Sequence, residues 1–584
     1  MKKHILSLIS LVIILLTGCS NGNKETWITG EIVNPGDSML QIGDSILPVT
    51  REGKITFRIN LKSPVFYDVS YRKITWGLYA EPGKKIGFIL RSDNLSDLVF
   101  YGDLVNENNI LKESIRIFEV TNSILNQEWI NIHKKNEQDF LSVIDSLQAL
   151  FLNQILSSQN KDNISGEFCQ LYSTDVKYGF GPMIFHYPDL HLAYSGEKIS
   201  LSRSILDYLN TIPTDNREYF HLSNYKSFCK SRIDFQANQI AIQNQDNVYF
   251  NAKKMQAVFQ VVPEMFKDLY IRDYWKSEYL AEFIDLNGIT NSASFISGFK
   301  ADAVEKEFIQ KIDDQINTEL ANREDHLVRI FKEVNGFVLE AHIFYPKKNM
   351  KKEKRAAMVI FHGGGFVLGN PSWAFGKARH YSELGMIAVA AQYRLSNYND
   401  ITPLDAIQDA KDLMLWLREN ADSLGIMVNK IAASGWSVGA QLCSTLAVFP
   451  DILPDSEINS SPDAILLTSP GTDTKGWFTE LLNGNIVNPQ DYSPVDHIRT
   501  GLPPCIILQG RDDTVTPLDG VQVFYDKLIA KNNYCEIWIY DNVGHLFTPT
   551  SLGDNGWPHP DKNIQEQADE KADDFLRKFD FIEK

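Results

Sequence analysis

The sequence predicts a doubly wound, mainly parallel α/β sheet in its C-terminal part, preceded by a small all-β domain and a helical region. From about residue 328, short apolar runs alternate with amphipathic helices, as buried strands with helical crossovers do. Residues 26–101 alternate in polarity between turn residues, which is typical of short antiparallel strands. Between these two parts, apolar residues recur at the spacing of one buried helix face.

The composition is that of a globular protein with more than one domain. Its 584 residues exceed the size of one ordinary domain, and 43% of them are hydrophobic and 22% charged. The net charge of −17 argues against nucleic acid as a partner, because phosphate binding needs a basic face. Solubility alone explains the acidity equally well.

Residues 1–18 have the organisation of a signal peptide. Met1-Lys2-Lys3 is basic, residues 5–16 are apolar, and Leu16-Thr17-Gly18-Cys19 follows. The apolar run is too short to span a bilayer comfortably, so we expect cleavage rather than a permanent membrane helix. Leu-Thr-Gly-Cys resembles the bacterial lipobox, which implies cleavage before Cys19 and lipidation of its thiol. The mature protein is then expected to be a membrane-tethered lipoprotein of a bacterial cell envelope, facing the periplasm or the cell surface. Ordinary secretion with a chance cysteine is the weaker alternative.

The remaining cysteines show no zinc-ligand spacing, so the sequence predicts no metal site. Cys443, Cys505 and Cys535 lie in apolar segments, where we expect small core residues. A Cys169–Cys229 disulfide stays open, because an oxidising envelope permits one and the sequence does not give the distance between the thiols.

Residues 19–104 are predicted to form a small β-sandwich-like domain after a short polar linker. Pro35-Gly36-Asp37, residues 51–54 and Pro82-Gly83-Lys84 are predicted turns between segments of alternating polarity. In placement and pattern the segment resembles the small β domain that opens many envelope lipoproteins whose C-terminal part is thioredoxin-like.

Residues 105–325 are predicted to be helical and to carry no chemistry. Their apolar residues recur at helical spacing, most clearly in residues 140–156, and their aromatic residues are expected to pack in the core rather than to form a ligand cage. The histidines in this region show no metal-ligand spacing.

Residues 326–584 are predicted to be the α/β domain. It begins with a predicted hairpin, in which residues 327–333 pair with residues 337–345 across the Asn335-Gly336 turn. Apolar strands are then predicted at residues 358–361, 387–391, 431–434, 464–469, 505–509 and 536–540.

Gly435-Trp436-Ser437-Val438-Gly439 has the Gly-x-Ser-x-Gly pattern of a nucleophile elbow. A serine at a sharp strand-to-helix turn exposes its hydroxyl, and small flanking glycines let the strand and the helix approach closely. Ordinary turns also use glycine and serine, so Ser437 needs a base, an acid and oxyanion donors elsewhere in the chain to be a nucleophile.

Phe361-His362-Gly363-Gly364-Gly365-Phe366 directly follows an apolar strand and supplies the predicted oxyanion donors. Consecutive glycines leave backbone N–H groups unobstructed, and acyl transfer needs such donors to hold a tetrahedral oxyanion. The predicted donors are the N–H groups of Gly364, Gly365 and Val438. A phosphate-binding loop is less favoured, because neither a dinucleotide fingerprint nor a Walker lysine is present.

The predicted acid and base follow two later strands. Asp512 is preferred as the acid over Asp513, because it stands three residues before Val515 as in the Asp-x-x-Val pattern of related hydrolases, and Asp513 remains the alternative. His545 is the predicted base, because it combines a loop after a strand with a position beyond Ser437 and the acid. His362, His497 and His559 are weaker candidates for the base. Of these, His362 is expected to orient the oxyanion loop.

The order Ser437, Asp512, His545 is that of α/β-hydrolases, and residues 328–580 resemble esterases and lipases of that fold. His-Gly-Gly-Gly-Phe is similar to hormone-sensitive-lipase-like carboxylesterases, as is Tyr393-Arg394-Leu395 followed by Pro403, Ala406 and Asp409. The elbow departs from that group, which usually has Gly-Asp-Ser-Ala-Gly-Gly. Asp-Asp-Thr-Val looks more like prolyl-oligopeptidase relatives and bacterial acetyl or feruloyl esterases.

The resemblance implies a serine carboxylic-ester hydrolase that needs no metal or organic cofactor and acts on a small-molecule or carbohydrate ester in the cell envelope. A prolyl-oligopeptidase-like peptidase is an alternative, weakened because no β-propeller repeats precede the hydrolase part. An envelope scaffold or binding lipoprotein is a second alternative. The sequence does not give the acyl group, the alcohol or the oligomeric state. Loops 369–379 and 472–489 carry four aromatic residues that either line an acyl or sugar site or pack as cover: Trp373, Phe375, Trp477 and Phe478.

Overall fold

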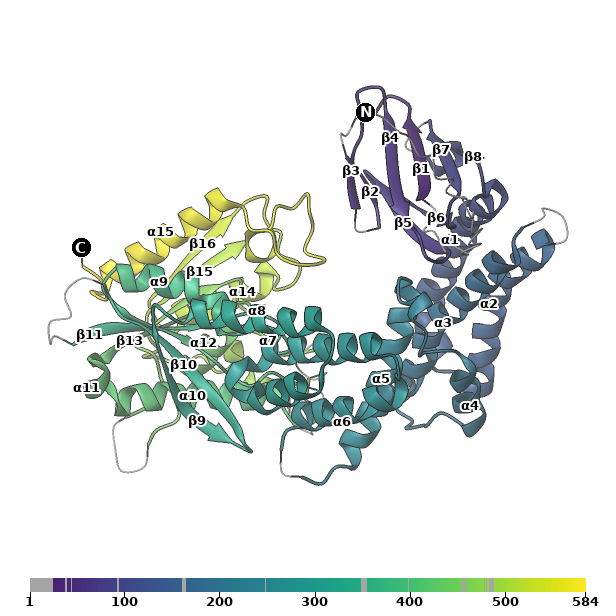
Figure 1. Ribbon diagram of the computed structural model, residues 1–584. Coiled ribbons are helices and arrows are strands. Elements are labelled where there is room, and N and C mark those ends of the chain that lie inside the picture. The colour runs from purple at the N-terminus through teal and green to yellow at the C-terminus, as the bar shows by residue number, and fades with distance from the viewer. Residues whose placement is uncertain are drawn as a thin grey trace, which may run out of the picture. The chain divides into compact units, whose positions relative to one another are not determined.

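A computed structural model (Figure 1) describes residues 25–583 except residues 37–38, 44, 92–93, 160–163, 247, 348–353, 398, 454–457, 477, 479–480 and 483–487. The chain divides into two compact units, Met1–Phe235 and Gln236–Lys584. The predicted helical region therefore contributes helices to both units. The predicted signal peptide and Cys19 lie outside the described residues, so cleavage and lipidation stay predictions.

The first unit begins with two four-stranded sheets that share one core. Their strand orders are β4-β1-β7-β8 and β3-β2-β5-β6. The strands are β1 (Glu25–Ile32), β2 (Met39–Ile42), β3 (Ser45–Pro48), β4 (Lys54–Asn60), β5 (Val65–Tyr71), β6 (Ile74–Ala80), β7 (Lys85–Leu90) and β8 (Leu98–Gly102). Trp76 of one sheet packs edge-to-face on Phe88 of the other, with 5.4 Å between ring centroids. One pairing differs from the all-antiparallel expectation, because β1 runs parallel to β7.

Long helices complete the first unit. They are α1 (Val105–His133), α2 (Glu137–Gln159), α3 (Gly166–Ser195) and α4 (Arg203–Thr211), and α5 (Ser223–Gln243) crosses the boundary between the units. Asn108 joins α1 to the β domain, accepting from Tyr79 N at 2.8 Å and donating to Tyr79 O at 3.1 Å. Residues 137–158 are long and apolar enough to span a membrane by composition alone. However, α2 packs against α1 and α3, and its buried side chains recur at the predicted helical spacing, as in an amphipathic helix with one buried face.

Cys169 and Cys229 are both free, buried thiols, so the disulfide left open by the sequence is not formed. Burial raises the pKa of the Cys229 thiol to about 12, so the thiol stays protonated and unreactive at neutral pH.

The second unit is built on an eight-stranded sheet of order β16-β15-β14-β13-β11-β12-β10-β9 (Figure 1). The strands are β9 (Leu327–Val334), β10 (Phe337–Phe344), β11 (Arg355–Phe361), β12 (Ile387–Ala391), β13 (Ile426–Trp436), β14 (Ala464–Thr468), β15 (Cys505–Gly510) and β16 (Cys535–Tyr540). β11 to β16 pair in parallel, whereas β9 and β10 are antiparallel, as the hairpin prediction requires. Asn335 and Gly336 both have positive φ, 48° and 73°, which a tight two-residue hairpin turn needs.

Helices cover both faces of this sheet, so the predicted doubly wound architecture is present. α10 (Pro403–Glu419), α12 (Val438–Val448) and α14 (Leu518–Ala530) share one core with the sheet. α9 (Phe375–Glu383) and α15 (Lys562–Lys578) share the core on the other face. Neighbouring residues of β11 alternate between the two cores, Val359 facing one and Ile360 the other. Strands buried on both faces explain why these segments are almost entirely apolar.

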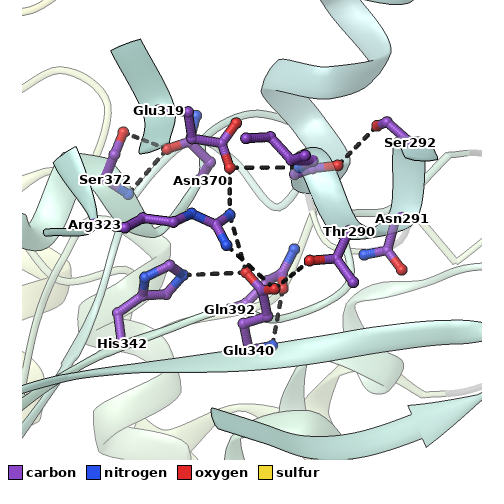
Figure 2. Close-up of polar contacts among 12 residues, drawn as sticks. Thr290, Asn291, Ser292, Glu319, Arg323, Glu340, His342, Asn370, Ser372 and Gln392 are labelled. Carbon is purple, nitrogen blue, oxygen red and sulfur yellow. Dashed lines mark hydrogen bonds and ion pairs between the residues drawn. The ribbon is translucent and has the colours of Figure 1, made fainter. Parts of the chain in front are cut away.

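The helix α6 (Phe250–Met265) is followed by α7 (Leu269–Asp302) and α8 (Lys306–Asn322). A polar network attaches α7 and α8 to the sheet (Figure 2). Arg323, just after α8, forms ion pairs with Glu319 and with Glu340 of β10, the latter at 3.1 Å. Burial alone raises the pKa of Glu340, but His342, Thr290 and Arg323 together lower it to about 2. Glu340 is therefore a carboxylate at neutral pH, held by donors on three sides.

The same helices reach the segment that follows the predicted oxyanion loop. α7 is interrupted at Gly288, whose φ of 80° and ψ of 164° are not helical. The interruption leaves the Asp285 carbonyl free to accept from Asn370 Nδ2 at 3.0 Å, and the Asp285 carboxylate accepts from the same amide group. A cavity of about 260 Å³ lies between α7, α8, β10 and residues 370–372. The helical layer thus anchors residue 370 and, with it, the end of the glycine loop.

Candidate active site

Ser437 lies at a sharp turn between β13 and α12. Its φ of 55° and ψ of −123° are strained for a residue with a side chain, as a nucleophile elbow requires. A Cβ on Gly435 would lie 2.3 Å from the Gly439 carbonyl carbon, and one on Gly439 would lie 2.1 Å from Phe361 O. Only glycine fits at either position, because both obstacles are backbone atoms. The two glycines thus let α12 begin directly against β11.

Ser437, His545 and Asp513 form a continuous hydrogen-bonded chain. His545 Nδ1 lies 2.9 Å from Asp513 Oδ2, and Nε2 lies 3.2 Å from Ser437 Oγ. A carboxylate only accepts hydrogen bonds, so Nδ1 carries the proton and Nε2 is free to accept from the serine hydroxyl. The three side chains come from the ends of β13, β15 and β16, which meet at one edge of the parallel sheet. This geometry can transfer the serine proton to the imidazole.

The preference for Asp512 over Asp513 is wrong. Asp512 is exposed, and its carboxylate accepts from Thr550 Oγ1 at 2.9 Å instead of contacting His545. Asp512 N donates to Val543 O, which continues the strand pairing past the end of β15. The next residue, Asp513, then faces inward, and its side chain is fully buried. The Asp-x-x-Val spacing could not reveal which of two adjacent side chains faces the sheet edge.

Asp513 is held as a carboxylate by several donors. Thr516 donates to it from its backbone N at 2.7 Å and its hydroxyl at 2.9 Å, and Gln509 Nε2 donates at 3.2 Å. Burial by itself raises the pKa of Asp513, but the bonds from His545 and Thr516 outweigh it and hold the pKa below its usual value. Sequence reasoning missed Thr516 and Gln509 as partners of the acid, although both lie in or beside the motif that carries it.

The glycine loop has the backbone conformation that only glycine adopts easily. Gly364 and Gly365 have φ of 118° and 63°, and a Cβ on Gly364 would lie 2.2 Å from Leu368 O. Val438 is the first residue of α12, where a backbone N–H has no acceptor within the helix. Among the described residues, none accepts a hydrogen bond from the N–H of Gly364, Gly365 or Val438. All three remain predicted oxyanion donors.

His362 orients this loop, as expected. It is buried, its Nδ1 lies 2.7 Å from Gly363 O, and Tyr393 stacks on its ring with 4.4 Å between centroids. Burial lowers the pKa of His362 to about 4, so the ring is neutral. Arg394, next to Tyr393, forms a bidentate ion pair with buried Asp409, in which both hydrogen bonds are 2.8 Å. The Tyr-Arg-Leu motif therefore holds His362 and the glycine loop in place, and it contributes no group to the hydrogen-bonded chain of Ser437, His545 and Asp513.

The aromatic residues predicted to line or cover the site take different positions. Phe375 and Phe478 are buried in the cores and act as cover, and Trp477 lies outside the described residues. Trp373 is 38% exposed and packs on His362. It also meets Trp557 edge-to-face, with 5.6 Å between centroids, and Trp557 is 66% exposed. Throughout the described part of the chain, no three His, Cys, Asp or Glu side chains are grouped so that they could hold a metal ion.

Comparisons with known proteins find similar sequences for the C-terminal part of the chain. Residues 358–549 match a family model described as alpha/beta hydrolase fold. Endo-1,4-beta-xylanase B of Butyrivibrio fibrisolvens is 28% identical over 196 residues, which are 30% of this chain and 30% of the xylanase. A probable carboxylic ester hydrolase, LipM, of Mycobacterium tuberculosis is 31% identical over 195 residues, which are 30% of this chain and 45% of that protein. The apo form of Thermogutta terrifontis esterase 2 is 30% identical, with 45% of this chain and 97% of the esterase covered and a TM-score of 0.40. The chain thus spans less than half the length of both curated relatives.

Exchanging Asp513 for asparagine should remove most of the nucleophilicity of Ser437. The amide cannot hold the histidine in the tautomer that accepts the serine proton, so we expect the rate of Ser437 labelling by a fluorophosphonate to fall by about 10³–10⁴-fold. Asp512→Asn is the matched control, because it changes the neighbouring exposed carboxylate, and its labelling rate should stay within about threefold of wild type. A larger loss in Asp512→Asn than in Asp513→Asn would contradict the assignment.

Proposed function

Starting from an α/β-hydrolase fold in the C-terminal part of the chain, we propose that this protein is a serine hydrolase that cleaves carboxylic esters through an acyl-enzyme. The observation that carries the proposal is the chain from Asp513 through His545 to Ser437 Oγ. Two curated relatives that match parts of this chain are named as hydrolases of esters, the probable carboxylic ester hydrolase LipM and an ethyl acetate hydrolase of Pseudomonas putida.

The proposed reaction follows from the positions of these groups. Ser437 Oγ attacks the ester carbonyl carbon while its proton passes to His545 Nε2. Asp513 stabilises the resulting imidazolium and keeps its orientation. The proton then moves to the departing alkoxide, which leaves as the alcohol. A water molecule then attacks the acyl carbon while its proton passes to His545 Nε2. The bond between the acyl carbon and Ser437 Oγ breaks, the carboxylic acid leaves, and His545 returns the proton to Ser437 Oγ.

The oxyanion of each tetrahedral intermediate is assigned to the N–H groups of Gly364, Gly365 and Val438. One such donor contributes about 3–4 kcal/mol to the stabilisation of the transition state in enzymes of this type. The helix that starts at Val438 adds a favourable dipole, because its positive end faces the developing charge.

Ser437→Ala should abolish hydrolysis of p-nitrophenyl acetate, with kcat falling by roughly 10⁶-fold because no acyl-enzyme can form. Ser423→Ala, at an exposed serine of the short helix α11 (Ala421–Leu424), is the control and should match wild type. Turnover that persists in Ser437→Ala would refute the proposed function. Cleavage of peptide amides without cleavage of any ester would instead favour a peptidase.

We also propose that the alcohol part of the substrate is a carbohydrate. Trp373 packs on His362, which leads into the glycine loop, and Trp557 lies in the segment that follows His545. The two exposed rings therefore come from the two loops that carry the oxyanion donors and the base. Flat aromatic faces suit the apolar faces of sugar rings, and exposed tryptophans often carry much of the energy of recognition. The relative named as a xylanase also acts, by its name, on a polysaccharide.

Removing both rings should therefore affect a sugar ester more than a small ester. In the double variant Trp373→Ala/Trp557→Ala, we expect kcat/KM for acetylated xylo-oligosaccharide to fall by about tenfold through a higher KM, with kcat/KM for p-nitrophenyl acetate changed by less than about threefold. Trp538→Ala is the control, because Trp538 of β16 is 39% exposed. Equal losses on the two substrates would contradict a carbohydrate-binding role.

A further inference from the structure

Residues 551–557, here called the strap, follow the turn that carries His545. Leu552 N donates to Pro549 O at 2.9 Å and Gly553 N to Thr550 O at 3.2 Å, which folds the strap into a compact turn. After the strap, the chain returns to the histidine turn, where His559 N donates to Thr548 Oγ1 and Asp561 N to Phe547 O. The strap is therefore held at both ends next to His545.

The strap places the Asp554 carboxylate between the turns that carry the base and the acid. Asp554 Oδ1 accepts from the backbone N of His545 at 2.8 Å. Asp554 Oδ2 accepts from the backbone N of Thr514 at 2.8 Å and from its hydroxyl at 2.9 Å. Thr514 directly follows Asp513 in the chain. The Asp554 carboxylate therefore bonds both the backbone of His545 and the residue next to Asp513.

The backbone on both sides of His545 leaves room for the Asp554 carboxylate. A Cβ on Gly544 would lie 2.3 Å from Asp554 Oδ1, so the residue before the histidine has to be glycine while the aspartate is in place. The residues after the histidine are strained, since Leu546 and Phe547 have φ of 51° and 64°. Such conformations cost about 1–3 kcal/mol each and persist only where surrounding contacts enforce them. Hydrogen bonds to a carboxylate are among the stronger contacts available for this purpose.

We propose that Asp554 is a positioning residue for the proposed ester hydrolysis, on which this inference rests. Asp554 bonds the turn that carries His545 and the turn that carries Asp513 at once. It thereby fixes the distance between Asp513 and His545 and directs His545 Nε2 toward Ser437. A displacement of about 1 Å in a catalytic group can lower the rate by about 10²-fold. The effect belongs in kcat, because Asp554 acts through His545 and not on the substrate.

Asp512 provides a matched comparison within the same two turns. Its carboxylate also joins them, through Thr550 Oγ1, but it bonds neither His545 nor the residue next to Asp513 on the C-terminal side. If any link between the turns sufficed, loss of Asp512 and loss of Asp554 would have equal effects. If the bond to the histidine backbone is what matters, only the loss of Asp554 lowers kcat.

The test compares Asp554→Ala, Asp554→Asn and Asp512→Ala in the full chain with p-nitrophenyl acetate. We expect Asp554→Ala to lower kcat by about 10–100-fold with KM within about threefold of wild type, and Asp512→Ala to stay within about threefold in both. Asp554→Asn should be intermediate, because its NH2 group replaces one of the two accepting oxygens. Thr514→Ser, which keeps the hydroxyl, should retain wild-type kcat.

A second readout does not depend on turnover. Amide hydrogen exchange of residues 541–550, measured by mass spectrometry, should be faster in Asp554→Ala than in Asp512→Ala. Equal kcat values in the two variants, or equal exchange rates, would overturn the positioning role. If wild type and Ser437→Ala were equally inactive, the proposed function would fail, and the exchange rates would still decide whether Asp554 holds the histidine turn.

Discussion

The close approach of α12 to β11 is the constraint on which the second unit's site depends. Gly439 lies so near Phe361 O that no side chain fits between them. This contact puts the strained Ser437 beside the start of the glycine loop, because His362 directly follows Phe361. The serine hydroxyl and the loop N–H groups therefore belong to one packed junction.

The acid and base depend on a second junction, between the loops that follow β15 and β16. Asp512 N pairs with Val543 O, and a Cβ on Gly510 would lie 2.3 Å from Gly544 O. The two loops are thus in backbone contact before any side chain joins them. Asp513 reaches His545 across this contact, and parallel pairing of β14 and β15 brings both toward the elbow, where Ser437 N bonds Thr468 O.

Much of this arrangement could be predicted from the sequence. The alternation of apolar runs and amphipathic helices predicted the mainly parallel sheet. The motifs around Ser437, Gly364 and His545 could be recognised because the local backbone geometry there requires particular residue types. The choice between Asp512 and Asp513 failed, because adjacent side chains on an extended chain point to opposite sides and the register past β15 is set by Val543. The parallel β1–β7 pairing is non-local and has no local signature.

Contacts made by isolated polar residues also could not be predicted from the sequence. Asp554 and Thr514 are 40 positions apart and match no motif, and Asn370 bonds both the backbone carbonyl and the carboxylate of Asp285, which lies 85 positions earlier in the chain. These contacts depend on the tertiary path of loops, which residue patterns do not encode. They are also the contacts that hold the predicted residues in position.

The central claim is that Ser437 becomes acylated during turnover, and rapid acid quenching tests it most directly. During turnover of p-nitrophenyl acetate, mass spectrometry of the quenched full chain should find one added acetyl group, located on the peptide that contains Ser437. The adduct should be absent after His545→Ala exchange, because the serine then lacks its base. An acetyl group on another residue, or turnover with no covalent adduct under any quench time, would contradict the account.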